Sequence, residues 1–207
     1  MTHTDFVIKY LSESAAISEK LKEQEKAISK IISILFEAWK NDSWVFILGN
    51  GGSASSATHF ASDLVKTVNT NPEARGIKAM ALADNIPLVS ALTNDWGWEN
   101  LYIAQLRNFW VPKSVAIGIS VHGGAGKDKS GNWSQNILKG LQFVKDSGGE
   151  TIGFSGFDGG PMKDLVDASV VVPADSTPHT ESFHVVLCHL ITFRLKEAIE
   201  AHVASQK

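Results

Sequence analysis

Apolar residues recur along this chain with two spacings, one typical of helices and the other of buried strands. Between residues 4 and 41 there is no glycine or proline, and the apolar residues fall at helical intervals. This pattern predicts one long helix or two in succession. Because the second part is apolar on more than one side, we expect residues 1–41 to pack against another copy of the chain.

Five short apolar runs predict buried strands. They are residues 44–48, 77–82, 114–120, 150–155 and 168–172. Segments with helical spacing lie between and after them, with helices expected from the residues after Ser53 and over 85–92, 132–147 and 181–201. Strands that alternate with helices predict an α/β fold, an open five-stranded parallel sheet with helices on both faces. Ligands bind such sheets beyond the carboxyl ends of the strands.

Residues 93–98, Thr-Asn-Asp-Trp-Gly-Trp, follow one predicted helix. Polar residues between two tryptophans are typical either of a ligand-facing loop or of a turn with aromatic packing. Their position at the end of a helix favours the turn. Residues 69–76 are expected to form a surface connection.

The composition narrows the class of protein. With 207 residues we expect one domain over 1–207, with residues 42–207 as its α/β core. The chain is 43% hydrophobic and 20% charged, and its net charge of -3 gives no electrostatic footprint for nucleic acid. The sequence shows no signal peptide and no apolar run near the roughly 20 residues of a membrane span. We therefore expect a cytoplasmic protein without a nucleic-acid or membrane partner.

The first candidate site is the glycine-rich loop after the first predicted strand, Gly49-Asn50-Gly51-Gly52-Ser53. Backbone N–H groups of such a loop, together with those of the following helix's first turn, form a pocket for an anion such as phosphate. The loop lacks the lysine of a Walker motif and fits the dinucleotide pattern poorly, so an ordinary strand-to-helix turn is an equal alternative. A second glycine-rich and hydroxyl-bearing loop, residues 120–131, favours the phosphate interpretation.

His59 and Asp63 lie one helical turn apart in the segment after the first loop. This spacing lets one helix bind a metal from one side, but it also fits a surface pair with a weak hydrogen bond.

The last predicted helix carries four more candidates in an apolar run: Glu181, His184, Cys188 and His189. Glu181, His184 and Cys188 fall within a narrow stripe, whereas His189 lies about 80° to the other side of Glu181. Helical geometry alone therefore favours His184 over His189 as a site residue. Cys188, the only cysteine, is expected to be a buried structural thiol.

Several motifs together resemble the phosphoheptose isomerase family of sugar isomerase (SIS) domains. In chain order they are GNGGSASSATHFASDL, TNDWGW, GIS before a glycine loop, GFSGFDGGPM and ESFHVVLCH. The resemblance implies a homotetrameric enzyme that converts sedoheptulose 7-phosphate to D-glycero-D-manno-heptose 7-phosphate, the first step towards the heptose units of bacterial surface glycans. It also implies the open parallel sheet already predicted.

The resemblance also implies roles for individual residues. It assigns substrate binding to Asn50, Gly51, Gly52, Ser53, Asn94, Asp95, Ser120 and Ser134. It assigns a divalent metal, often zinc, to His59, Asp63, Glu181 and His189, and we expect Asp63 and His189 to be the catalytic acid–base pair. This set contains His189 rather than His184, because ligands at a subunit interface need not share a narrow face.

Three departures from the family pattern bear on the substrate. Asp63 stands where the family usually has glutamate, and Glu181 stands where it has glutamine, which should bind a divalent cation more tightly. In the second loop, Val121 and His122 replace hydroxyl residues, and an insertion carrying Lys127 and Lys129 precedes Ser134. Two alternatives therefore stay open: an isomerase of another heptose or octose phosphate, and a non-catalytic SIS protein that binds a sugar phosphate or a replication-initiator partner.

Overall fold

The computed structural model describes residues 1–69, 71–124 and 133–206, and a five-stranded sheet lies at its centre. The strands are β1 (Trp44–Gly49), β2 (Lys78–Ala81), β3 (Val115–Ile119), β4 (Glu150–Ser155) and β5 (Ala168–Val171). Their order is β2-β1-β3-β4-β5, and every neighbouring pair is parallel. The predicted fold class, an open five-stranded parallel sheet, is confirmed.

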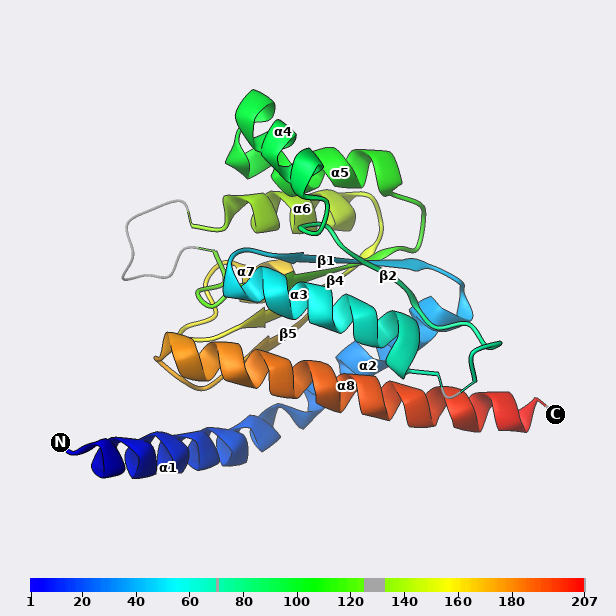
Figure 1. Ribbon diagram of the computed structural model, residues 1–207. Helices are drawn as coiled ribbons and strands as arrows, with labels where there is room; N and C mark the ends of the chain where they lie inside the picture. The colour runs from blue at the N-terminus through cyan, green and yellow to red at the C-terminus, as the bar shows by residue number, and fades with distance from the viewer. Residues whose placement is uncertain (70, 125–132, 207) are drawn as a thin grey trace.

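Helices cover both faces of the sheet, as predicted (Figure 1). They are α1 (His3–Leu21), α2 (Glu25–Lys40), α3 (Gly52–Ser62), α4 (Ile86–Trp96), α5 (Leu101–Phe109), α6 (Gln135–Asp146), α7 (Met162–Leu165) and α8 (Thr177–Ser205). Three shorter turns complete the chain: the 3-10 helices η1 (Lys22–Gln24) and η3 (Trp98–Asn100) and the π-helical η2 (Asp63–Thr67). Helices α2, α3 and α8 lie on one face, and α4, α5 and α6 lie on the other.

The side chains of β1 show why the strands are almost continuously apolar. Val45 and Ile47 belong to the core under α2, α3 and α8, whereas Phe46 and Leu48 belong to the core on the other face. Because alternate residues of a strand point to opposite faces, a strand covered on both sides needs apolar residues at every position.

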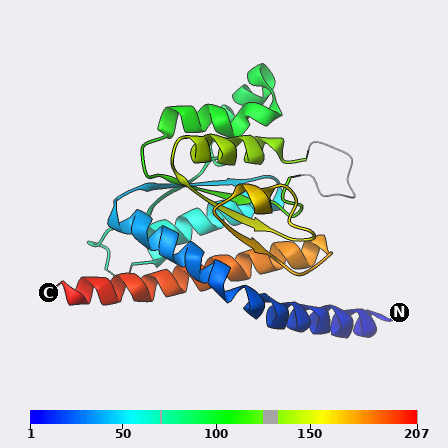
Figure 2. The ribbon, with the colours of Figure 1, turned by 180° about the vertical axis from the view of Figure 1, so that it is seen from behind.

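The N-terminal segment is two helices, α1 and α2, separated by η1. Helix α1 extends past the body of the molecule (Figure 2). Only Ile17 and Leu21, near its C-terminal end, are buried, whereas four apolar side chains nearer the N-terminus are more than half exposed. These four are Phe6, Val7, Ile8 and Leu11.

The prediction of a turn over residues 93–98 is wrong for the first part of this segment, because α4 continues to Trp96. Asn85 caps the start of α4 by accepting a hydrogen bond from the Leu88 N–H, and the helix ends only at Gly97, whose φ of 85° falls in the left-handed region. Helices α5 and α7 were not predicted.

Among the described residues, no helix combines the length and apolar character needed to cross a membrane.

Candidate functional site

The carboxyl ends of β1 and β3 lie side by side in the sheet, so the two glycine-rich loops that follow them meet. A pocket of about 350 Å³ opens between them. Its polar lining residues are Asn50, Ser53, Ser120, His122, Ser134, Thr177 and Glu181. The structure therefore brings together four of the side chains predicted to bind substrate: Asn50, Ser53, Ser120 and Ser134.

The conformation of the first loop depends on its glycines. Gly51 has a φ of 55°, and a Cβ on Gly49 would lie 2.3 Å from the carbonyl oxygen of Ser53. A side chain at Gly49 would thus push the loop away from the first turn of α3. Among the described residues, no side chain caps α3 by a hydrogen bond at its N-cap, so this turn is suited to an anionic ligand.

The second loop approaches the same pocket through two hydroxyl groups. The Ser120 hydroxyl donates to Oγ of Ser134 at 3.2 Å, and Ser134 is the N-cap of α6, with a φ of 49°. The His122 ring packs edge-on against Trp133 and tilted against Phe157, with centroid distances of 5.4 and 4.3 Å. Lys127 and Lys129 lie outside the described residues.

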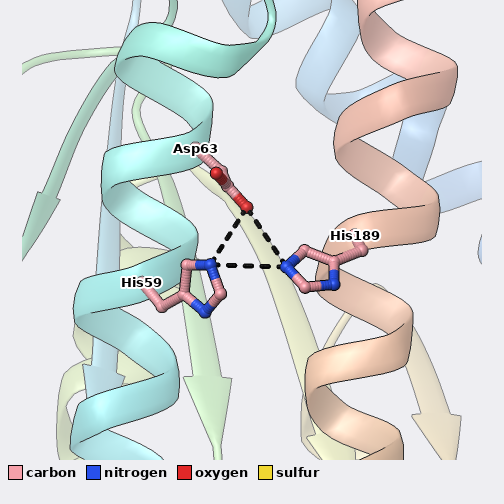
Figure 3. A group of neighbouring side chains, drawn as sticks. All are labelled: His59, Asp63 and His189. Atoms are coloured by element: carbon pink, nitrogen blue, oxygen red, sulfur yellow. Dashed lines mark hydrogen bonds and ion pairs between the residues drawn. The ribbon is translucent and has the colours of Figure 1, made fainter.

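His59, Asp63 and His189 converge from two helical segments far apart in the sequence (Figure 3). His59 lies on α3, Asp63 begins η2 and His189 lies on α8. Nε2 of His59 is 3.3 Å from Nε2 of His189, and Oδ2 of Asp63 is 3.6 Å from the former and 3.8 Å from the latter. Three potential ligand atoms thus face one point in space.

The spacing of these atoms fits one divalent cation. Tetrahedral ligands at the usual 2.0–2.1 Å from zinc lie about 3.3 Å apart, close to the three distances of the cluster. Two imidazoles and a carboxylate are also a ligand set that zinc and other transition metals accept. The side chains of His59 and His189 are 48% and 47% exposed, so the cluster is open to a substrate.

The π-helical turn η2 orients the carboxylate of Asp63. Thr67 donates a hydrogen bond to Oδ1 of Asp63 at 3.0 Å, which leaves Oδ2 facing the two histidines. The Asp63 side chain is only 14% exposed. Hydrogen bonds of this kind hold a metal-ligating carboxylate in place, and π-helical turns often occur at functional sites.

Glu181 does not join this cluster within one chain. Its carboxylate lies against the start of α3, where a Cβ on Gly52 would be 2.6 Å from Oε1 of Glu181. It lines the pocket between the two loops instead. A place for Glu181 among the metal ligands therefore stays a prediction.

The preference for the stripe of Glu181, His184 and Cys188 is wrong, because two of its members face the core. His184 is fully buried, and burial lowers its pKa to about 4. Cys188 is buried as predicted, and burial together with the nearby charge of Asp63 raises the pKa of its thiol. Helix α8 packs against α2 and α3, so its core-facing stripe carries His184 while the opposite side carries His189.

Asn94 and Asp95 lie in the last turn of α4, and Nδ2 of Asn94 donates to Oδ1 of Asp95 at 2.7 Å. Both are exposed, and α4 lies on the opposite face of the sheet from α3 and α8 (Figure 1). The chain does not bring these two residues to the pocket, so their predicted contact with substrate would need a second copy of the chain.

The sequence-based predictions did not include four residues that lie around the site: Thr67, Tyr102, Asn136 and Thr177. Thr67 is four residues after Asp63, a spacing that places both on one helical face and was a usable signal. Asn136 and Tyr102 reach the first loop from the helices on the other face of the sheet, and nothing local in the sequence marks them.

Comparisons with known proteins agree with this geometry. A family model described as SIS domain matches residues 9–156. A phosphoheptose isomerase of Helicobacter pylori is 34% identical over 197 residues, covering 95% of each chain, and one of Trichlorobacter lovleyi is 31% identical over 195 residues, covering 94% of each.

Solved structures share the fold. A phosphoheptose isomerase structure from Neisseria gonorrhoeae superposes with a TM-score of 0.83 at 22% identity, covering 95% of this chain and 100% of that one. One from Francisella tularensis gives a TM-score of 0.85 at 21% identity, with the same coverage.

Proposed function

The chain belongs to the phosphoheptose isomerase family of SIS-domain proteins, and from this we propose that it converts sedoheptulose 7-phosphate to D-glycero-D-manno-heptose 7-phosphate. The resemblance found in the sequence is thereby confirmed. Membership makes the protein a phosphosugar isomerase, an aldose–ketose isomerase, and the particular sugar is our proposal.

One observation carries the proposal: a phosphate-type pocket and a cluster of acid–base groups lie along the same helix. The pocket is at the N-terminus of α3, and His59 lies seven residues further on, about 10 Å along the helix axis. A sugar with its phosphate at one end and its carbonyl group at the other suits two sites separated in this way.

The chemistry needs two proton transfers at carbon. A base removes the proton from the carbon beside the carbonyl group, which gives an enediolate; an acid then returns a proton to the former carbonyl carbon, while a hydroxyl proton passes from the neighbouring oxygen to the former carbonyl oxygen. We assign these steps to Asp63 and His189, whose side chains approach each other to 3.8 Å from η2 and α8. Ser53, Ser120 and Ser134 anchor the phosphate, and this remote binding energy orients the reacting carbons.

The cluster would hold a divalent metal, which we propose to be zinc, on His59, Asp63 and His189, with Glu181 as a further ligand. When bound, such an ion polarises the carbonyl group and stabilises the negative charge that develops on its oxygen. The hydrogen bond from Thr67 fixes which oxygen of Asp63 faces the histidines.

We also propose that the enzyme works as a homotetramer. The apolar side chains of α1 that are exposed in a single chain support this, as does the distance of Asn94 and Asp95 from the pocket within one chain. A neighbouring copy of the chain would cover the apolar side chains of α1 and would bring its own Asn94 and Asp95 to the pocket.

An assay with sedoheptulose 7-phosphate tests the proposal. The purified protein should form the aldose, followed by NMR or a coupled reaction, and Asp63→Asn and His189→Ala should each reduce turnover by about 10²-fold or more. Glu197→Gln changes an exposed carboxylate on α8 and should leave turnover unchanged.

Three results would contradict the proposal. Full activity of either site variant would remove the acid–base assignment. Turnover of another heptose or octose phosphate, but not of sedoheptulose 7-phosphate, would change the substrate, which is the outcome favoured by Val121 and His122 in the second loop. A metal-free protein without isomerase activity would indicate a non-catalytic SIS protein.

A further inference from the structure

The pocket lies between two helices whose N-termini both face it, α3 from the first loop and α6 from the second. An anion held by both would need the two helix starts at a fixed spacing. The pairing of β1 with β3 sets the approximate distance between the two helix starts, and contacts between the first loop and α6 can fix it further.

A reciprocal pair of amides makes this contact. Nδ2 of Asn50 donates to Oδ1 of Asn136 at 3.0 Å, and Nδ2 of Asn136 donates to Oδ1 of Asn50 at 2.8 Å. Asn136 is in the first turn of α6 and is fully buried. Its Oδ1 also accepts from the N–H of Ile137 at 2.9 Å, so its own orientation is fixed. The orientation of Asn50 follows from that of Asn136.

Tyr102 supports the same loop from α5. Its hydroxyl donates to the carbonyl oxygen of Gly49 at 2.5 Å and lies 3.4 Å from Oδ1 of Asn50. Burial raises the pKa of Tyr102 to about 12, so its hydroxyl keeps its proton and can donate at neutral pH. Helices α5 and α6, on the other face of the sheet from α3, thus hold both Gly49 and Asn50 in place.

We propose that Asn136 is a positioning residue that holds the starts of α3 and α6 at the spacing required for the substrate's phosphate. The Asn50–Asn136 pair links the first loop directly to the start of α6, and Tyr102 fixes the Gly49 end of that loop. The proposal rests on the proposed function only for the identity of the substrate, since any phosphate held between the two loops would depend on the same link.

Breaking the pair should weaken phosphate binding rather than the proton transfers. Truncating Asn136 leaves the partly buried amide of Asn50 without its partner and frees the loop to move. Because the phosphate is bound in both the ground state and the transition state, the effect should appear in KM more than in kcat.

The experiment compares Asn136→Ala and Tyr102→Phe with Gln105→Ala. Gln105 is a matched control, because its amide is also buried and its hydrogen bonds within the described part of the chain go to the backbone carbonyls of Leu82 and Leu101 rather than to the first loop or α6. Three quantities are measured for each variant: the affinity for inorganic phosphate, KM and kcat for sedoheptulose 7-phosphate, and amide hydrogen exchange of the peptide spanning residues 49–56.

We expect Asn136→Ala to weaken phosphate affinity and to raise KM by about 10-fold, with kcat changed less than threefold, and to speed exchange of the 49–56 peptide. Tyr102→Phe should act in the same direction but less strongly. Gln105→Ala should change none of the three quantities.

Unchanged phosphate affinity and unchanged exchange in Asn136→Ala would overturn the inference, and so would an equal effect of Gln105→Ala. If Asn136→Ala does not fold, Tyr102→Phe decides by the same readouts, because Tyr102 supports the loop without lining the pocket. A wild-type protein that binds phosphate through Asn136 but does not isomerise sedoheptulose 7-phosphate would refute the proposed function and leave this inference standing. A wild-type protein that binds no phosphate would overturn the inference itself.

Discussion

Glu181 is the residue whose place in the site matters most for the substrate. Its carboxylate lies at the start of α3, where the free N–H groups of the helix attract negative charge. A phosphate entering the pocket would meet a carboxylate already there. Because the family usually has a neutral glutamine at this position, Glu181 should make the pocket of this chain less favourable to a dianion.

We therefore expect Glu181→Gln to bind inorganic phosphate more tightly than the wild type. Removing one negative charge a few ångströms from the anion relieves about 1 kcal/mol of repulsion, which corresponds to about fivefold in affinity. Isothermal titration with inorganic phosphate measures this, and Glu197→Gln on the same helix is the control. If phosphate affinity stays constant while divalent-cation affinity falls, Glu181 belongs with the metal ligands.

The burial of one histidine, His184, makes the stability of the protein depend on pH. It is fully buried near the ring of Phe154, and neither ring nitrogen makes a hydrogen bond of good geometry among the described residues. Burial lowers its pKa from 6.5 to about 4, and the backbone of Ser155 offsets only part of this shift. The folded protein therefore keeps His184 neutral where the unfolded chain would protonate it.

This difference predicts a loss of stability as the pH falls from 6.5 towards 4. Below pH 6.5 the unfolded chain binds a proton that the folded chain does not, so unfolding becomes more favourable, by about 2 kcal/mol at pH 5. Urea unfolding at pH 7 and pH 5 should show a smaller pH effect in His184→Leu than in the wild type. His3→Gln, at an exposed position, should behave as the wild type. An unchanged pH effect in His184→Leu would contradict the prediction.

At the scale of elements, the strands were predictable because both faces of the sheet are covered. Residues such as Val45 and Phe46 face opposite cores, so each strand appears in the sequence as an apolar run. Helix α5 was missed because its apolar residues follow the tryptophans of the 93–98 segment without a clear starting signal. The end of α4 was misplaced because Gly97, rather than the polar residues before it, stops the helix.

The site was predictable only where its residues lie close in the sequence. The first loop and the His59 and Asp63 pair have local spacing that indicates their chemistry. The choice between His184 and His189 depended on which side of α8 faces the core, and helical periodicity alone favoured the wrong residue. The link from Asn136 to Asn50 joins residues 86 apart, and no local pattern encodes it.

Helix α1 gives an element-scale prediction about assembly. Phe6, Ile8 and Leu11 are exposed in a single chain, and burying each such side chain contributes about 1.5–3 kcal/mol. We expect the double variant Ile8→Glu/Leu11→Glu to lower the mass of the particle below that of the wild type, which we propose to be a tetramer, in size-exclusion chromatography with light scattering. Ser12→Glu, at an exposed polar position on the same helix, is the control. A wild-type monomer, or an unchanged mass of the double variant, would contradict this.

For the molecule as a whole, the cluster of His59, Asp63 and His189 joins segments that are distant in the sequence. His59 and His189 are 130 residues apart, and their helices α3 and α8 lie side by side on one face of the sheet. A cation shared by both helices would bind the folded chain far better than the unfolded one. It should therefore stabilise the fold as well as complete the site.

Removal of the metal should thus lower the melting temperature as well as the activity. A cation at 100 times its dissociation constant contributes about 2.7 kcal/mol, and for a chain of this length that corresponds to about 5–10 °C. Thermal unfolding of the wild type with and without a chelator, and after zinc is added back, measures this effect. His59→Ala should show no response to either treatment. His202→Ala is the control and should respond as the wild type does, because this histidine of α8 packs against Phe36 and Trp39 away from the cluster. If chelation leaves the wild-type melting temperature unchanged, or if His59→Ala responds as strongly as the wild type, the three residues do not form a metal site.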